Sequence, residues 1–78
     1  MEKQIIEILS DISMELIEDM DRDLLASDIL DSFDIVKLVV ALEEAFDIVI
    51  DADLIVPENF QTANTIIALV KSIIDNRI

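Results

Sequence analysis

Leu30-Asp31-Ser32-Phe33 opens the stretch that decides the fold, LDSFDIVKLVVALEEAFD at residues 30–47. At 100° per residue, its apolar side chains fall on two opposite faces of a helix that we predict from Ser32 to about Asp47. The face expected in the core carries Leu38, Leu42, Ala45 and Phe46, with Ile35 at its edge. The other face carries Phe33, Val36 and Val40, fringed by the acidic residues Glu43, Glu44 and Asp47. An apolar face bordered by acid is typical of a surface that binds partner proteins, and we interpret the second face in this way.

Ser32 stands where this helix is predicted to begin. The exposed backbone N–H groups and the positive end of the helix dipole favour a phosphate at such a position. We therefore interpret Ser32, flanked by Asp31, as an attachment point for a phosphate-linked group. The alternative is that Ser32 is only the N-cap of the helix, a role that serine performs well without any further function.

Two other main helices are predicted from apolar periodicity. The first spans residues 2 to about 17, with an apolar stripe of Ile5, Leu9, Ile12 and Leu16 widened by Ile6, Ile8 and Ile17. The last runs from Ala63 to about Asn76, with Thr62 as its cap and an apolar face of Ile66, Ile67, Val70, Ile73 and Ile74. Pro57 suits the first turn of a short helix from about Val56 to Phe60.

The remaining segments are predicted to be irregular. Residues 18–31 form a long loop, which Leu24, Leu25, Ile29 and Leu30 would hold against the core. Residues 47–53 alternate like a strand, but a lone strand has no partner, so we expect an extended connector. The predicted fold is all-α, a small four-helix bundle of three main helices and one short helix, with a long loop between the first and second helices. We expect a single domain over residues 1–78.

Asp19, Asp21 and Asp23 are spaced like the first three ligands of a calcium-binding EF-hand loop. The pattern then fails, because Leu24 stands where such a loop needs glycine and Leu30 where it needs glutamate. We expect a solvated turn here and keep a weak, nonspecific divalent-ion site at these three aspartates as the alternative.

The composition argues against catalysis by this chain. Without histidine or cysteine, Ser32 has no ordinary base to make it a nucleophile, and disulfides and zinc–thiolate sites are excluded. Without glycine, the chain has no phosphate-binding loop of the P-loop or dinucleotide type. No apolar run approaches the ~20 residues of a membrane span, and nothing resembles a signal peptide. The cytoplasm is the expected location.

The net charge of −13 restricts the partners. It would repel nucleic acid and anionic membranes, so we expect neither nucleic-acid binding nor membrane insertion. It favours partner enzymes with basic docking patches, found through long-range attraction. The alternative is that the acidic surface only keeps a small protein, expected to be a monomer, in solution.

The ordered set of motifs in this chain resembles the acyl and peptidyl carrier proteins. It comprises Leu30-Asp31-Ser32-Phe33, Val36, Leu38 to Val40, Ala41-Leu42-Glu43-Glu44, Phe46-Asp47-Ile48 and Pro57-Glu58-Asn59-Phe60-Gln61-Thr62. These carriers have a D-S-[LMF] motif opening a helix that ends in a similar L-E-E-x-F-D run, and many have P-E-x-F-x-T before the last helix. The resemblance covers essentially the whole chain.

The resemblance implies that Ser32 receives 4′-phosphopantetheine from coenzyme A, added by a separate phosphopantetheinyl transferase that uses magnesium. The thiol of the arm would then hold cargo as a thioester for partner enzymes. Because the chain has no cysteine, thiol chemistry must come from such an arm. Phe33, Val36 and Val40 would enter grooves of the partner, while Glu43, Glu44 and Asp47 meet its basic residues.

The cargo is open between two subtypes. We prefer acyl intermediates of fatty-acid, polyketide or related synthesis, with D-alanyl or aminoacyl/peptidyl cargo as the alternative. Lys37 stands where many fatty-acid carriers have glutamate, and Leu30 replaces the usual glycine as in some D-alanyl carriers. Residues 64–70, N-x-I-I-A-x-V, are also similar to D-alanyl carriers. The alternative of another class is an unmodified acidic helical adaptor that uses the face of Phe33, Val36 and Val40 for protein binding.

Overall fold

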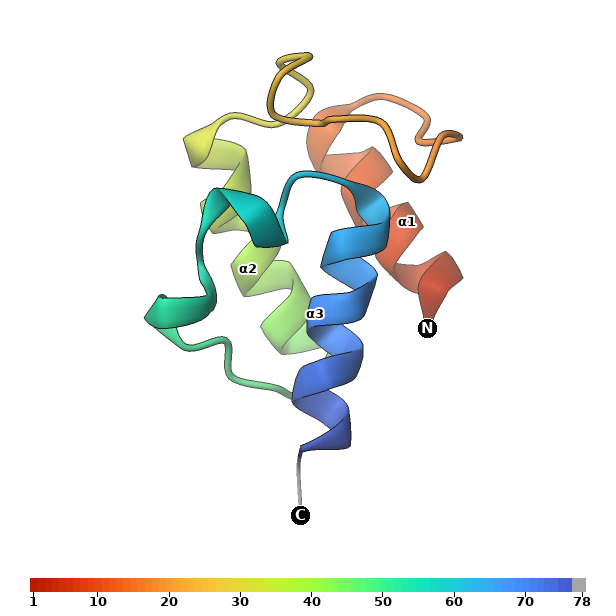
Figure 1. Cartoon of the computed structure of the whole chain (residues 1–78). Helices are drawn as coiled ribbons and strands as arrows, with labels where there is room; N and C mark the ends of the chain where they lie inside the picture. The colour runs from red at the N-terminus through yellow and green to blue at the C-terminus, as the bar shows by residue number, and fades with distance from the viewer. Residues whose placement is uncertain (77–78) are drawn as a thin grey trace.

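The computed structural model describes residues 1–76 as a bundle of α1 (Glu2–Ser13), α2 (Ser32–Phe46) and α3 (Ala63–Asp75). Two 3-10 turns, η1 (Ala52–Leu54) and η2 (Pro57–Asn59), lie between α2 and α3. Figure 1 shows the three helices packed together, with the first loop crossing one end of the bundle. Residues 1–76 contain no strand, so the all-α prediction is confirmed, but the expected fourth helix is a single 3-10 turn.

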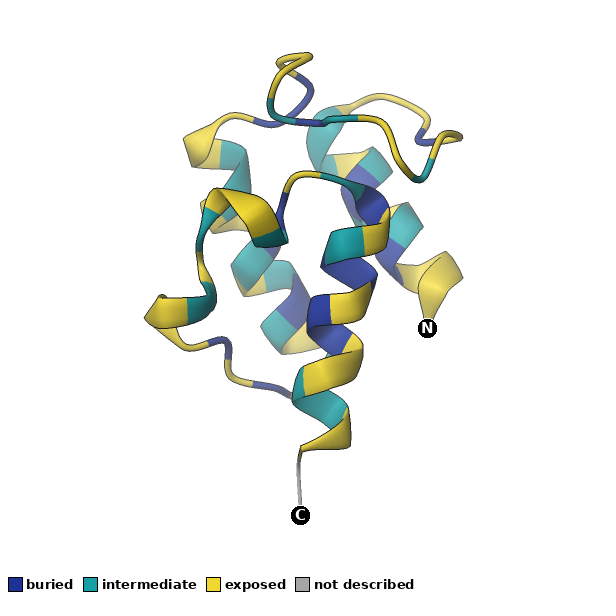
Figure 2. Ribbon diagram, in the orientation of Figure 1, coloured by how far each residue is buried: buried dark blue, intermediate teal, exposed yellow. Residues whose placement is uncertain are grey.

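The core is filled by large apolar side chains from all three helices and from the loops. Figure 2 shows the buried residues on the sides of the helices that face the centre of the bundle. The largest fully buried side chains are Phe60, Ile5, Leu9, Leu24, Leu30, Leu38, Leu42, Ile66 and Val70. Leu38 and Leu42 lie in the core as predicted, but Ala45 is exposed and Phe46 is only half-buried, because the last turn of α2 lies at the edge of the core.

The first helix ends earlier than its apolar stripe predicts. It stops at Ser13, where the side-chain hydroxyl donates to the carbonyl of Leu9 at 2.8 Å, and Met14 follows in the left-handed conformation with φ 59°. Leu16, expected on the buried stripe, is therefore outside the helix and 76% exposed. Ile17 still reaches the core, from the loop.

The first loop, residues 14–31, is fastened to the start of α3. The backbone N–H of Leu24 donates to the carbonyl of Gln61 at 2.7 Å. The side-chain amide of Gln61 donates to Asp23 Oδ2 at 2.9 Å, and that of Asn64 donates to Asp21 Oδ1 at 2.7 Å. The loop is thus an ordered cover over one end of the bundle, and its apolar residues Leu24, Leu25, Ile29 and Leu30 pack on the core as predicted.

These contacts give Asp19, Asp21 and Asp23 a structural role in the first loop, and weak divalent-ion binding there stays an alternative. Asp21 and Asp23 bind side-chain amides, while Asp19 Oδ1 accepts the N–H of Asp21 at 3.0 Å. Within residues 1–76, no group of three acidic side chains is arranged to hold a metal ion. The aspartates act as hydrogen-bond acceptors that shape the loop.

The segment between α2 and α3 is less extended than predicted. Residues 48–51 connect α2 to η1, a 3-10 turn that was not predicted from the sequence. The second turn, η2, is shorter than the helix expected from Val56 to Phe60. The side-chain amide of Asn59 donates to the carbonyl of Leu54 at 2.7 Å and joins the two turns. The last helix begins at Ala63 with Thr62 as its cap, as predicted.

Candidate functional site

The start of α2 is capped by Asp31, one residue before the helix. Asp31 Oδ1 accepts the backbone N–H of Asp34 at 2.8 Å, and Asp34 Oδ2 accepts the backbone N–H of Asp31 at 3.4 Å. This reciprocal pair is a capping box, which satisfies backbone donors at the helix end. The alternative that Ser32 serves only as the N-cap is therefore wrong, because Asp31 has that role and Ser32 is the first residue of the helix.

Ser32 is exposed, and its hydroxyl makes no hydrogen bond with any other group in residues 1–76. Ser32 is the first residue of α2, at the positive end of the helix dipole, where a phosphate is favoured. A hydroxyl with no structural role can be esterified without breaking a contact of the fold. The site therefore fits a covalently attached phosphate ester.

An apolar groove of about 230 Å³ begins at Ser32. Its other walls come from α2 and from the segment around η2, and its lining residues are Ile35, Val36, Ile55, Val56, Pro57 and Phe60. A flexible group attached to Ser32 would find apolar surface directly beside its attachment point. This groove was not predictable from periodicity within α2, because that pattern contains no information on how Ile55 and Val56 fold back against the helix.

The apolar face of α2, formed by Phe33, Val36 and Val40, is open to solvent. These side chains are 71%, 63% and 49% exposed, although residues of their size and apolarity ordinarily enter a core. Contiguous exposed apolar surface of this kind marks an interaction site. The face is exposed as predicted, its binding of partners stays a prediction, and we call it the docking face.

The acidic fringe of the docking face is smaller than predicted. Glu44 and Asp47 are exposed, whereas Glu43 is half-buried and its Oε2 accepts the backbone N–H of Ile50 at 2.9 Å. Glu43 therefore fastens the connector after α2 and is only partly available to a partner. A basic group also lies on this face, because Lys37 Nζ stands 5.3 Å from the centre of the Phe33 ring.

The site thus combines a serine whose hydroxyl makes no hydrogen bond within residues 1–76, an apolar groove beside it and an exposed apolar helix face. The family described as "Phosphopantetheine attachment site" matches residues 3–73, and the chain belongs to this family. Proteins of this family carry covalently attached 4′-phosphopantetheine, and the exposed hydroxyl of Ser32 fits that group. The chain is thus a carrier protein, which holds its cargo and does not itself catalyse a reaction.

The chain is similar to D-alanyl carrier proteins of two Lactococcus lactis subspecies. Those of Lactococcus lactis subsp. cremoris strains MG1363 and SK11 are 42% identical over 73 residues, covering 91% of this chain and 92% of each relative. That of Lactococcus lactis subsp. lactis strain IL1403 is 41% identical over the same length. In the part of this chain that the structure describes, no helix has both the length and the apolarity to cross a membrane.

Proposed function

We propose that Ser32 is the attachment point of 4′-phosphopantetheine and that the arm carries D-alanine as a thioester. The single observation that supports the site is the exposed Ser32 hydroxyl, which is free of hydrogen bonds within residues 1–76 because Asp31 caps the helix. The D-alanyl cargo is supported by relatives with that name at 42% identity over almost their whole length.

In the attachment step, Ser32 Oγ attacks the phosphorus that bears the pantetheine arm of coenzyme A. A new P–O bond forms to Ser32, the pyrophosphate P–O bond breaks, and adenosine 3′,5′-bisphosphate leaves with the electron pair. This chain contains no histidine, and the Ser32 hydroxyl contacts no carboxylate within residues 1–76. The transferase, with its magnesium ion, must therefore supply the base that takes the serine proton and the positive charge that stabilises the leaving group.

Intact-protein mass spectrometry tests the site. The apo chain is incubated with coenzyme A, magnesium and a broad-specificity phosphopantetheinyl transferase. We expect the mass of one phosphopantetheine to be added to the parent and none to Ser32→Ala. Ser72→Ala is the matched control, since Ser72 is an exposed serine on α3, and it should be modified like the parent. Modification of Ser32→Ala, or no modification of the parent by an active transferase, would contradict the proposal.

Acyl cargo, which the sequence analysis preferred, is the second candidate. The apolar groove beside Ser32 supports it, because an alkyl chain gains free energy by leaving water for such a surface, whereas the alanyl group is small and positively charged. The holo chain should be offered to an ATP-dependent D-alanine ligase and to an acyl-carrier synthetase, with L-alanine as a stereochemical control. D-alanyl loading without acyl loading supports the D-alanyl carrier, and the reverse result supports the acyl carrier.

The third reading, an unmodified helical adaptor, is not supported by the family match, whose members carry the covalent arm. The proposed partners are therefore the transferase, the enzyme that loads the arm and the enzyme that unloads it. Each would meet the same docking face, because that face adjoins Ser32 on α2.

A further inference from the structure

Lys37 is a positive charge at one edge of the docking face, beside Phe33. It follows Phe33 by four residues, so the two side chains lie on the same side of α2, and its ammonium stands 5.3 Å from the centre of the Phe33 ring. Val40 and Glu44 lie one and two turns further along the same side. Lys37 is exposed, like its neighbours on this face.

No carboxylate in residues 1–76 neutralises Lys37. The only ion pair described in that part of the chain joins Lys71 Nζ to Glu2 Oε1 at 3.5 Å. On α2, Phe33 and Ala41 occupy the positions four residues before and after Lys37, where an acidic partner would be expected. The nearest acid by helix spacing, Asp34, is engaged in the capping box.

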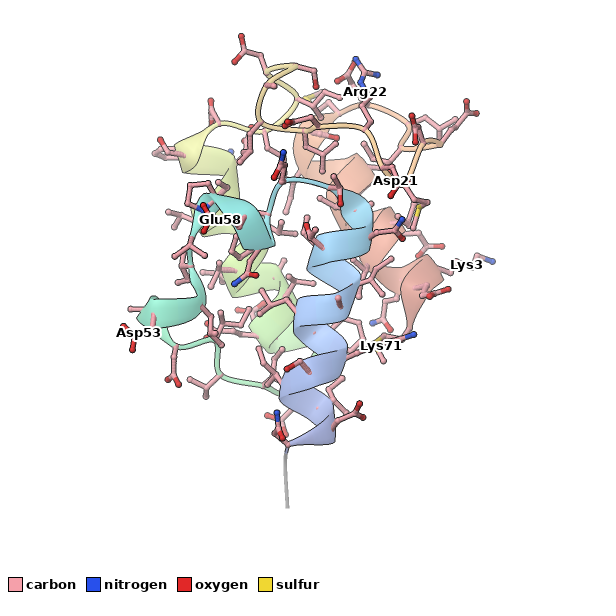
Figure 3. All side chains as sticks on the ribbon, in the orientation of Figure 1. Lys3, Asp21, Arg22, Asp53, Glu58 and Lys71 are labelled. Atoms are coloured by element: carbon pink, nitrogen blue, oxygen red, sulfur yellow. The ribbon has the colours of Figure 1, made fainter. Side chains whose placement is uncertain are left out.

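The other described basic residues lie away from α2. Figure 3 labels Lys3 on α1, Arg22 in the first loop and Lys71 on α3. Lys37 is therefore an isolated cation on the surface that an otherwise strongly acidic chain presents to its partners. A docking face that met only basic groups of a partner would gain nothing from a positive charge beside Phe33, because like charges brought together disfavour association.

A partner that covers Phe33 and Val40 must also remove water from the ammonium of Lys37. Contact with the Phe33 ring compensates only part of the lost hydration, since such cation–π contacts are weak at exposed sites. A buried charge needs an opposite charge or hydrogen-bond acceptors to offset its desolvation. We propose that the enzyme loading the arm presents a carboxylate to Lys37, alongside basic groups opposite Glu44 and Asp47. This inference rests on the proposed function.

This inference is tested by whether reversing the charge of Lys37 raises or lowers the KM for the carrier. The steady-state kinetics of D-alanine loading are measured for the holo parent, Lys37→Arg, Lys37→Gln and Lys37→Glu. A facing carboxylate predicts that Lys37→Glu raises the KM for the carrier by roughly tenfold or more, with little change in kcat. Lys37→Gln should have a smaller effect, and Lys37→Arg should retain most activity. The effect of Lys37→Glu should shrink as salt is added, because salt screens the repulsion.

Two controls separate docking from other causes. Lys3→Glu makes the same change in net charge on α1, and its KM should stay within about twofold of the parent, since the charge lies away from the docking face. Thermal melts of the Lys37 variants should match the parent, because the side chain is exposed and pairs with no carboxylate in residues 1–76.

The outcomes are distinguishable from failure of the proposed function. If Lys37→Glu lowers KM, the enzyme surface facing Lys37 is basic and the inference is overturned. If the KM values of all three Lys37 variants equal that of the parent, Lys37 lies outside the interface and the inference is also overturned. If the parent itself accepts no D-alanine from an active ligase, the proposed cargo is wrong and the inference falls with it.

Discussion

The capping role of Asp31 predicts that two neighbouring substitutions have different effects on stability. Asp31→Ala removes the acceptor of the 2.8 Å hydrogen bond from the backbone N–H of Asp34. Loss of an N-cap costs about 0.5–2 kcal/mol, and we expect about 1 kcal/mol here, because the reciprocal bond to Asp34 is long and stays possible in the variant. For a domain of this size, that change lowers Tm by about 4–8 °C.

The measurement is urea unfolding followed by far-UV circular dichroism, with thermal melts as a second readout. Asp31→Asn is the matched control, because its side-chain oxygen can still accept the N–H of Asp34, and its unfolding free energy should stay close to that of the parent. Ser32→Ala breaks no hydrogen bond within residues 1–76 and should change stability by no more than about 0.5 kcal/mol. Equal destabilisation by Ser32→Ala and Asp31→Ala would refute the reasoning, because Ser32 would then share the structural role that we assign to Asp31 alone.

Two further predictions concern the core and the first loop. Leu42 is fully buried and Val40 is 49% exposed, so Leu42→Ala should cost about 2–5 kcal/mol and Val40→Ala no more than about 1 kcal/mol in urea unfolding. Comparable losses would show that the docking face is core. The N–H of Ala26 and then the side-chain amide of Gln61 hold the pKa of Asp23 below its ordinary value. A lowered pKa in the folded state stabilises the fold above the ordinary pKa, and this contribution is lost as pH falls through the folded-state value. The urea midpoint of the parent should therefore fall in acid more steeply than that of Asp23→Asn, and parallel curves would contradict the assignment.

The parts of the fold that sequence predicted best are those with local signals. α2 and α3 begin where Asp31 and Thr62 cap them, and the two-faced pattern of α2 correctly separated buried Leu38 and Leu42 from exposed Phe33 and Val36. Capping and periodicity depend on residues within one or two turns, so a single helix carries enough information to predict them.

The predictions for the end of α1 and for Glu43 failed for a common physical reason. Both depend on contacts that an apolar periodicity does not reveal. The end of α1 depends on the hydroxyl of Ser13 and on Met14 in a left-handed conformation, which ordinarily favours glycine, so the usual signal for a helix end was missing. The helical pattern predicts Glu43 at the fringe of the docking face. The backbone N–H of Ile50, seven residues later, engages it instead.

The geometry around Ser32 was predictable only in part, for the same reason. The position of Ser32 at a helix start is a local feature. In the structure Ser32 is the first residue of α2, and its hydroxyl makes no hydrogen bond within residues 1–76. The groove beside it joins α2 to residues 55–60, and nothing in either segment alone indicates that they meet. The contact between Lys37 and Phe33 follows from their spacing, but its importance appears only once the docking face is known to be exposed.

Asp31 caps α2, and the Ser32 hydroxyl takes no part in the cap. This arrangement affects how enzymes would recognise the carrier before and after the arm is attached and loaded. Because Asp31 and Asp34 cap α2 without the Ser32 hydroxyl, a group attached to that hydroxyl would break none of the hydrogen bonds of the cap. The cap of α2 would then give an enzyme no sign of which stage the carrier has reached. An enzyme that must accept only the loaded form has to read the arm itself, inside its own active site. Order in such a pathway is then set by the chemistry of the cargo, and the carrier can return through the cycle unchanged.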